Sequence, residues 1–283
     1  MQLSPRYDGP PLLVLDVPPG DPSAAVVRQR TRLADALTSF SAAQWAAPSR
    51  CEGWSVQDVI THLVSTNQFW ALSITAGCSG EPTRFLATFD PVTSPADLVD
   101  KARGQSAASV LERFVESNDA LAAAMAAVDE GTWDTTVAEA PPGHLALRGV
   151  ALHALWDSWV HERDILLPLG LPVVEADDEV AGCLLYGAAL GPAFLASTGS
   201  TREGAYVIDA TDPDVRCVVE IGPTVRVHRG DAPEGALHIT GRAVDLLEAL
   251  SYRIPLDVEV PADDAWMLDG LAEVFDRVPG GGA

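Results

Sequence analysis

A change in sequence pattern near residues 197–204 constrains the fold of this 283-residue chain more than any other feature. Before it, apolar residues recur at helical spacing over long segments, as in the run from Val26 to Leu37. After it come short runs rich in β-branched residues, separated by turn signals such as Asp212-Pro213. Helical and strand periodicities segregated in this way predict a helical domain followed by a smaller α+β domain.

The expected boundaries follow from this pattern. Residues 1–21 are proline-rich and are expected to form an extended arm, residues 22–199 a bundle of four or five helices, and residues 200–283 the α+β domain. The helices are expected at 22–40, 55–76, 94–128 with a break near Gly104, from after Gly143 to Pro168, 177–196, 241–251 and 263–278. The strands are expected at 205–209, 215–221, 224–229, 236–240 and 256–260.

Composition excludes several classes of function. The net charge is −22, from 18 basic and 40 acidic residues, which makes nucleic acid and anionic membranes improbable partners. No apolar run approaches the roughly 18 residues of a membrane helix, and the first residues do not read as a signal peptide. The four cysteines are scattered and form no CxxC pair. We therefore expect a cytoplasmic protein with reduced thiols.

The residues that carry chemistry lie on two of the expected helices. His153, Asp157 and His161 are four residues apart, so their side chains share one helical face, and His62 lies on another helix. If the bundle brings the two helices together, imidazole nitrogens and a carboxylate oxygen could surround a divalent metal. A fourth position would remain open, as in catalytic metal sites.

Spacing alone leaves a structural alternative, in which these residues form a polar ladder in the core. Asp157 favours the metal, because it lies between tryptophans in an apolar run and an ionised carboxylate is seldom buried without a partner. Asp164, one turn beyond His161, could accept that imidazole's other N–H. Arg242 and Arg253 could fix an anionic substrate, or could form surface ion pairs.

The sequence also resembles a known family. The segment from Trp45 to Leu63 is similar to the opening signature of the mycothiol-dependent maleylpyruvate isomerase family, within the broader DinB-like group. The residues that carry the likeness are Trp45, Pro48, Gly53, Trp54, Ser55, Val56, Asp58, Val59, His62 and Leu63. The family's second signature, an acidic residue, three residues and then His-x-x-Asp, is similar to Asp157, His161 and Asp164.

The resemblance implies that His62, Asp157 and His161 hold a metal, with zinc the usual ion, and that Asp58 and Asp164 support them. The family's isomerase usually has glutamate in place of Asp157. The shorter carboxylate would draw the metal towards its helix, or would leave His153 to complete the coordination. If His153 is not a ligand, it would orient one of the ligands or contact the substrate. The α+β segment resembles the family's sterol-carrier-like domain, which implies an arginine that closes over the site; the first choice is Arg253 and the second Arg242.

The function that follows is a zinc-dependent enzyme using a low-molecular-weight thiol such as mycothiol. It would act as an isomerase or S-transferase on a small electrophile, one that carries a carboxylate, and would be a monomer or homodimer. Two alternatives stay open. One is a thiol-independent hydrolase or lyase, which needs the same ligands. The other is a binding or regulatory protein that keeps the bundle without activity.

Overall fold

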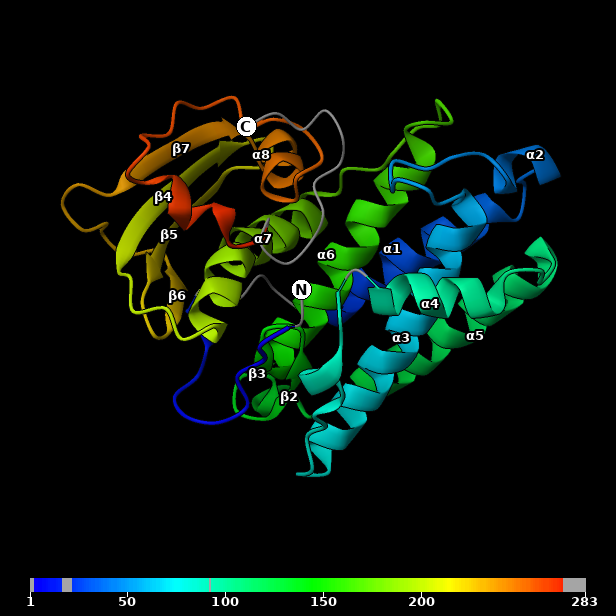
Figure 1. Ribbon diagram of the computed structural model, residues 1–283, viewed down its shortest axis with the longest axis horizontal. Coiled ribbons are helices and arrows are strands. Elements are labelled where there is room, and N and C mark those ends of the chain that lie inside the picture. The colour runs from blue at the N-terminus through cyan, green and yellow to red at the C-terminus, as the bar shows by residue number, and fades with distance from the viewer. Residues whose placement is uncertain (1–2, 17–21, 92, 272–283) are drawn as a thin grey trace.

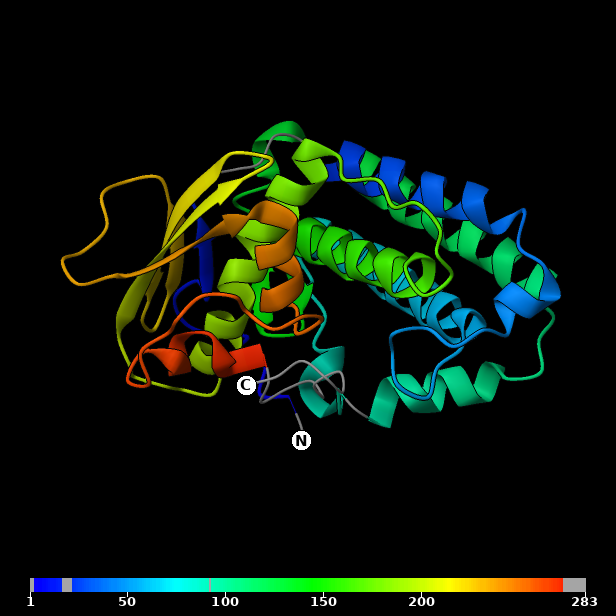
Figure 2. The same ribbon diagram turned by 90° about the horizontal axis from the view of Figure 1, so that it is seen from above.

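The computed structural model describes residues 3–16, 22–91 and 93–271. The helices are α1 (Pro22–Leu37), α2 (Ala42–Trp45), α3 (Val56–Cys78), α4 (Thr93–Ala102), α5 (Ala107–Ala126), α6 (Leu147–Leu166), α7 (Asp177–Ser197) and α8 (Ala243–Leu250), with 3₁₀ turns η1 (Phe85–Thr88), η2 (Glu130–Thr132), η3 (Ala265–Met267) and η4 (Asp269–Leu271). The strands are β1 (Leu13–Leu15), β2 (Val137–Ala140), β3 (Gly143–Ala146), β4 (Gly204–Thr211), β5 (Val215–Ile221), β6 (Val225–His228) and β7 (Leu237–Arg242). Figures 1 and 2 show the sheet on one side of the molecule and the bundle on the other. The predicted fold class, a helical bundle followed by an α+β domain, is confirmed.

Helix α3 is fixed at its first residue by a capping box. The Ser55 side chain accepts a hydrogen bond from the Asp58 backbone N–H, and the Asp58 carboxylate accepts one from the Ser55 backbone N–H. Val59, Ile60 and Leu63 are fully buried, so one face of α3 is set against the rest of the bundle. These two constraints fix the direction in which His62 projects.

Helix α6 runs between the bundle and the α+β domain (Figure 1). It packs against α1 and α3 on the bundle side and against α7 on the other. Because α6 has protein on both sides, seventeen of its twenty residues are buried, and polar residues on it need partners inside the protein.

The five-stranded sheet has the order β1-β6-β5-β4-β7. Its edge strand β1 comes from the N-terminal segment and lies parallel to β6. The expected extended arm therefore contributes to the sheet, which residues 200–283 do not build alone. Nothing in the sequence pattern indicated this pairing.

Helix α7 is a core helix that packs against α6, α8 and the sheet strands β5 and β6. Its Gly187 allows a close contact with neighbouring side chains, since a Cβ there would meet the Leu247 side chain at 3.3 Å and Trp156 at 3.5 Å. By length and composition α7 is the one helix in the described residues that could cross a membrane. However, 83% of its most apolar window is buried inside the protein.

Three local features differ from the sequence prediction. Residues 256–260 form no strand, because prolines 255 and 261, which have no N–H to donate to a sheet, flank the segment. The helix expected at 263–278 is replaced by η3 and η4 as far as residue 271, where Gly270 packs directly on the Gly191 backbone; residues 272–278 lie outside the described part of the chain. The hairpin of β2 and β3 was not predicted at all.

Candidate metal centre

Three of the predicted side chains converge between α3 and α6. The Asp157 Oδ1 atom lies 3.8 Å from His62 Nε2 and 3.6 Å from His161 Nε2. All three ligand atoms lie within 4.8 Å of one another. The two imidazole rings are nearly perpendicular, with centroids 5.0 Å apart, so both rings direct a nitrogen towards the same carboxylate.

This donor set fits a zinc ion. Zn–N and Zn–O bonds of about 2.0–2.1 Å in a tetrahedral site place neighbouring ligand atoms roughly 3.3–3.5 Å apart, close to the 3.8 and 3.6 Å that separate Asp157 Oδ1 from the two imidazole nitrogens. The Asp157 Oδ2 atom is buried and has no hydrogen-bond partner among the described residues, which leaves a carboxylate lone pair free. The side chains of His62, Asp157 and His161 are 12–15% exposed, so a small ligand can approach from one side.

Asp164 orients His161 from behind. Its Oδ2 atom lies 3.0 Å from His161 Nδ1, which directs Nε2 towards Asp157, as carboxylates do for metal-binding histidines. Burial opposes ionisation of Asp164, but Arg253 and His161 together outweigh burial and hold the pKa of this carboxyl well below its usual range. Burial likewise disfavours the charged form of His161, but Cys51, Asp164 and Asp157 together raise its pKa to about 10. In the metal-free protein the His161 imidazole is therefore protonated at neutral pH.

Asp157 is also ionised. Burial raises the pKa of its carboxyl, but the histidines His62, His161 and His153 more than offset that effect and hold the pKa below its usual range. A buried carboxylate beside two imidazoles is thus available as an anionic ligand.

Cys51 forms a second possible ligand group with His161 and Asp164. Its Sγ atom lies 3.6 Å from His161 Nδ1 and donates to Asp164 Oδ2 at 3.3 Å. The Asp164 carboxylate is already held by two guanidinium groups, from Arg50 and Arg253, at 2.9 Å. Because these cations occupy the lone pairs that a metal needs, the group around His62 is the better site.

His153 lies deep in the core and apart from both ligand groups. Its side chain is packed by aromatic rings, its Nδ1 atom is 2.6 Å from the Tyr186 hydroxyl, and only 3% of the residue is exposed. Burial lowers the pKa of His153 to about 4, although Asp157 opposes the shift, so the imidazole is neutral at physiological pH. The structure brings His153 towards Tyr186 rather than towards solvent.

The two arginines lie at the junction between the domains. Arg253 donates from Nε to Asp164 Oδ1 at 2.9 Å and from Nη2 to Asp164 Oδ2 at 2.9 Å, and its Nη1 atom donates to the Ser251 carbonyl at 3.1 Å. Its donors face Asp164, on the far side of His161 from the metal position. Arg242 forms an ion pair with Glu175 and is 42% exposed. Neither guanidinium lies free in the site.

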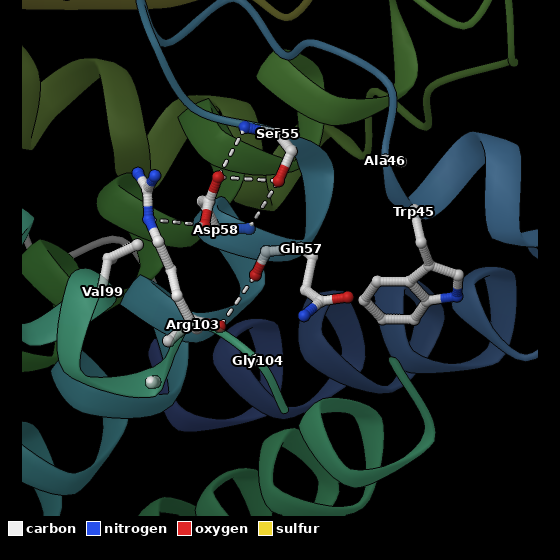
Figure 3. Close-up of a pocket in the computed structure, with 10 residues that line it drawn as sticks. Trp45, Ala46, Ser55, Gln57, Asp58, Val99, Arg103 and Gly104 are labelled. Carbon is white, nitrogen blue, oxygen red and sulfur yellow. Dashed lines mark hydrogen bonds and ion pairs between the residues drawn. The ribbon is translucent and has the colours of Figure 1, made fainter. Parts of the chain in front are cut away.

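Asp58 takes part in the helix cap described above and borders a cavity of about 230 Å³ between the start of α3 and the end of α4. Figure 3 shows its carboxylate bonded to Ser55, with the Arg103 Nε atom 3.9 Å away. Trp45 and Gln57 also line this cavity. The role that the structure gives Asp58 is therefore to start α3 and so to place His62.

Three residues near the site were not found from the sequence: Arg30, Arg50 and Cys51. Cys51 and Arg50 stand directly before the Gly53-Trp54-Ser55 signature, so proximity to that motif was a usable signal. Arg30 follows Val26 by four residues and so falls on the buried stripe of α1, where a charged residue is unexpected.

The fold and the site together define a class: a helical bundle that presents two histidines and an aspartate, joined to an α+β domain. Residues 26–166 match the family described as the mycothiol maleylpyruvate isomerase N-terminal domain, and through this domain the chain belongs to that family.

Two relatives and two solved structures are similar to this chain over most of its length. Uncharacterized proteins of Mycobacterium tuberculosis strains CDC 1551 and H37Rv are each 24% identical over 270 residues, covering 92% of this chain and 98% of theirs. The crystal structure of the mycothiol-dependent maleylpyruvate isomerase matches with a TM-score of 0.60 and 16% identity, over 87% of this chain and 96% of that chain. A histidine-to-alanine mutant of that enzyme gives 0.59 and 15%, over 84% and 90%. At these identities the structures establish a shared fold.

Proposed function

We propose that this protein is a zinc-dependent enzyme that uses a low-molecular-weight thiol of the mycothiol type. Its reaction is isomerisation or S-transfer on a small electrophilic substrate that carries a carboxylate. The observation that carries the proposal is the convergence of His62, Asp157 and His161 on one partly exposed point. Membership of the mycothiol maleylpyruvate isomerase N-terminal domain family supports the choice of thiol.

The residues around the site have distinct roles in this proposal. His62, Asp157 and His161 would hold the ion, and the partly exposed side of this group would admit the thiol. Asp164 accepts the Nδ1–H of His161 and so keeps Nε2 directed at the ion, and Arg253 keeps Asp164 ionised and in place. When bound, the ion stabilises the thiolate form of a coordinating thiol near neutral pH.

Isomerisation needs no net consumption of the thiol. The thiolate sulfur adds to one carbon of an electrophilic alkene, and the former double bond rotates as a single bond. Elimination of the same sulfur then restores the double bond in the trans form and releases the thiolate. For S-transfer, the thiolate instead displaces a leaving group, and the thioether is the product.

We also propose that the protein is cytoplasmic and is a monomer or a homodimer. Burial of the apolar helix α7 in the core supports a role of that helix inside the protein rather than in a membrane. Neither property is required for the chemistry, which depends on the site within one chain.

A thiol-dependence screen tests the proposal. Purified protein is assayed against electrophilic alkenes and alkylating agents that bear a carboxylate, with and without mycothiol, using wild type, His62→Ala and a control, His238→Ala, at an exposed position of β7. The proposal expects turnover only with thiol, lost in His62→Ala and kept in His238→Ala. Full turnover without thiol would instead indicate a metal hydrolase or lyase. A protein without metal or turnover would be the binding or regulatory alternative.

A further inference from the structure

A buried arginine bonds to both helices that carry the candidate metal ligands, α3 and α6. Arg30, on α1, is only 2% exposed. Its Nε atom donates to Asn67 Oδ1 at 2.8 Å and its Nη2 atom donates to the Ala154 carbonyl at 2.9 Å. Both partners are neutral. The Nη1 atom is buried and has no hydrogen-bond partner among the described residues.

Asp157 lies three residues beyond Ala154, about one turn further along α6. Burial lowers the pKa of the Arg30 guanidinium to about 10, and the negative charge of Asp157 opposes that shift. Arg30 is therefore cationic at neutral pH. Asp157 Oδ2 is likewise a buried polar atom without a hydrogen-bond partner in the described part of the chain. Asp157 stabilises the Arg30 cation through a protein interior that screens charge weakly.

The other ionic groups nearby do not cancel this charge. Asp164 is matched by Arg50 and Arg253, and His153 is neutral because it is buried. A divalent ion held by two neutral histidines and Asp157 carries one net positive charge. Arg30 adds a second inside the same weakly screened region.

We propose that Arg30 is a positioning residue whose fixed positive charge makes the open coordination position selective for an anionic ligand. A net positive charge in a low-dielectric interior is costly, and an anion at the open position offsets it, whereas a neutral ligand does not. The inference rests on the proposed metal site and deepens it: the ligand class that this site selects is anionic, such as a thiolate.

The competing explanation is purely structural, with Arg30 tying α1 to α3 and α6 through its two hydrogen bonds. The two explanations differ in what they predict for ligands of different charge. Loss of a tie would loosen the site for every ligand alike. Among ligands of the open position, loss of the charge would weaken the binding of anions and leave neutral ligands unaffected. It would also strengthen the binding of the metal cation itself.

The experiment uses the cobalt-substituted protein, in which visible absorption reports on the open position. Azide is the anionic probe and imidazole the neutral one, and zinc affinity is measured by competition with a chelator. The variants are Arg30→Met and Arg30→Gln, which remove the charge, and Arg30→Lys, which keeps it. Arg30→Gln retains an amide donor and guards against loss of folding, which circular dichroism checks.

The proposal expects both neutral variants to bind azide about tenfold more weakly, imidazole as wild type does, and zinc about tenfold more tightly, with Arg30→Lys close to wild type. An equal fall in azide and imidazole affinity, unchanged azide binding, or an Arg30→Lys protein that behaves like Arg30→Met would overturn it. A wild-type protein that binds no cobalt or zinc at this site would instead show that the proposed function itself is wrong.

Discussion

Asp164→Asn is the substitution that most directly probes how the two domains support the site. The Asp164 carboxylate is fully buried. It accepts hydrogen bonds from Arg50, Arg253 and the Cys51 thiol, and it pairs with His161 Nδ1. Asparagine has nearly the same shape but no charge, so it leaves two guanidinium groups without their shared anion.

Breaking a buried ion pair by removing one partner typically costs about 3–5 kcal/mol. The partners Arg50 and Arg253 are 18% and 15% exposed, so solvent screens the pairs only weakly. We expect the midpoint of thermal unfolding to fall by about 10 °C, because each kcal/mol shifts it by about 2–4 °C in a chain of this size. Because Asp164 also orients His161, zinc affinity should fall about 10–100-fold.

The effect should depend on pH with a defined sign. Arg253 holds the pKa of Asp164 well below its unfolded value, so the stabilisation is present above pH 4 and is lost as the pH falls below that value. The stability gap between wild type and Asp164→Asn, followed by circular dichroism, should therefore shrink between pH 7 and pH 3.

Asp8→Asn is the matched control, because the Asp8–Arg84 pair is 81% and 54% exposed and such surface pairs contribute about 0–1 kcal/mol. Equal losses of stability in the two variants at pH 7, or a gap that does not shrink in acid, would refute this reasoning.

Three further results are expected. Tyr186→Phe leaves the His153 imidazole without its buried partner and should cost about 1–3 kcal/mol in denaturant unfolding with unchanged zinc content; a loss of zinc would contradict the placement of His153 outside the ligand set. Zinc binding at pH 7 to 9 should release about one proton from His161, because the pKa of this imidazole is raised to about 10. Calorimetry in buffers of different ionisation enthalpy should show this proton release, and the affinity for zinc should rise with pH. Gly143→Ala should destabilise the protein, because a Cβ there would lie 2.1 Å from the Arg6 carbonyl oxygen at a φ of +139°; unchanged thermal stability would argue against this contact.

The candidate site was largely foreseeable from local spacing. Asp157 and His161 lie one turn apart, and this separation survives any packing of α6. Likewise, the Ser55–Asp58 cap fixed where α3 begins, and hence the face on which His62 projects. Residue spacing does not predict that α3 packs against α6. The resemblance to a known family indicated this contact.

Interactions between distant segments could not be read from the sequence. The arginine expected to reach over the site, Arg253, points instead to Asp164, where it joins Arg50 and His161 around a fully buried carboxylate. In the same way, β1 joins the sheet through backbone hydrogen bonds to β6, which leave no trace in side-chain periodicity. Such pairings depend on tertiary packing and not on local pattern.

Elemental analysis of purified protein shows whether His62, Asp157 and His161 hold a divalent metal. The measurement compares wild type, a double variant with His62→Ala and His161→Ala, and the control His238→Ala, each after dialysis against a weak chelator. We expect stoichiometric zinc in wild type and in the control, and none in the double variant. Zinc retained at full stoichiometry by the double variant, or absent from wild type, would contradict it.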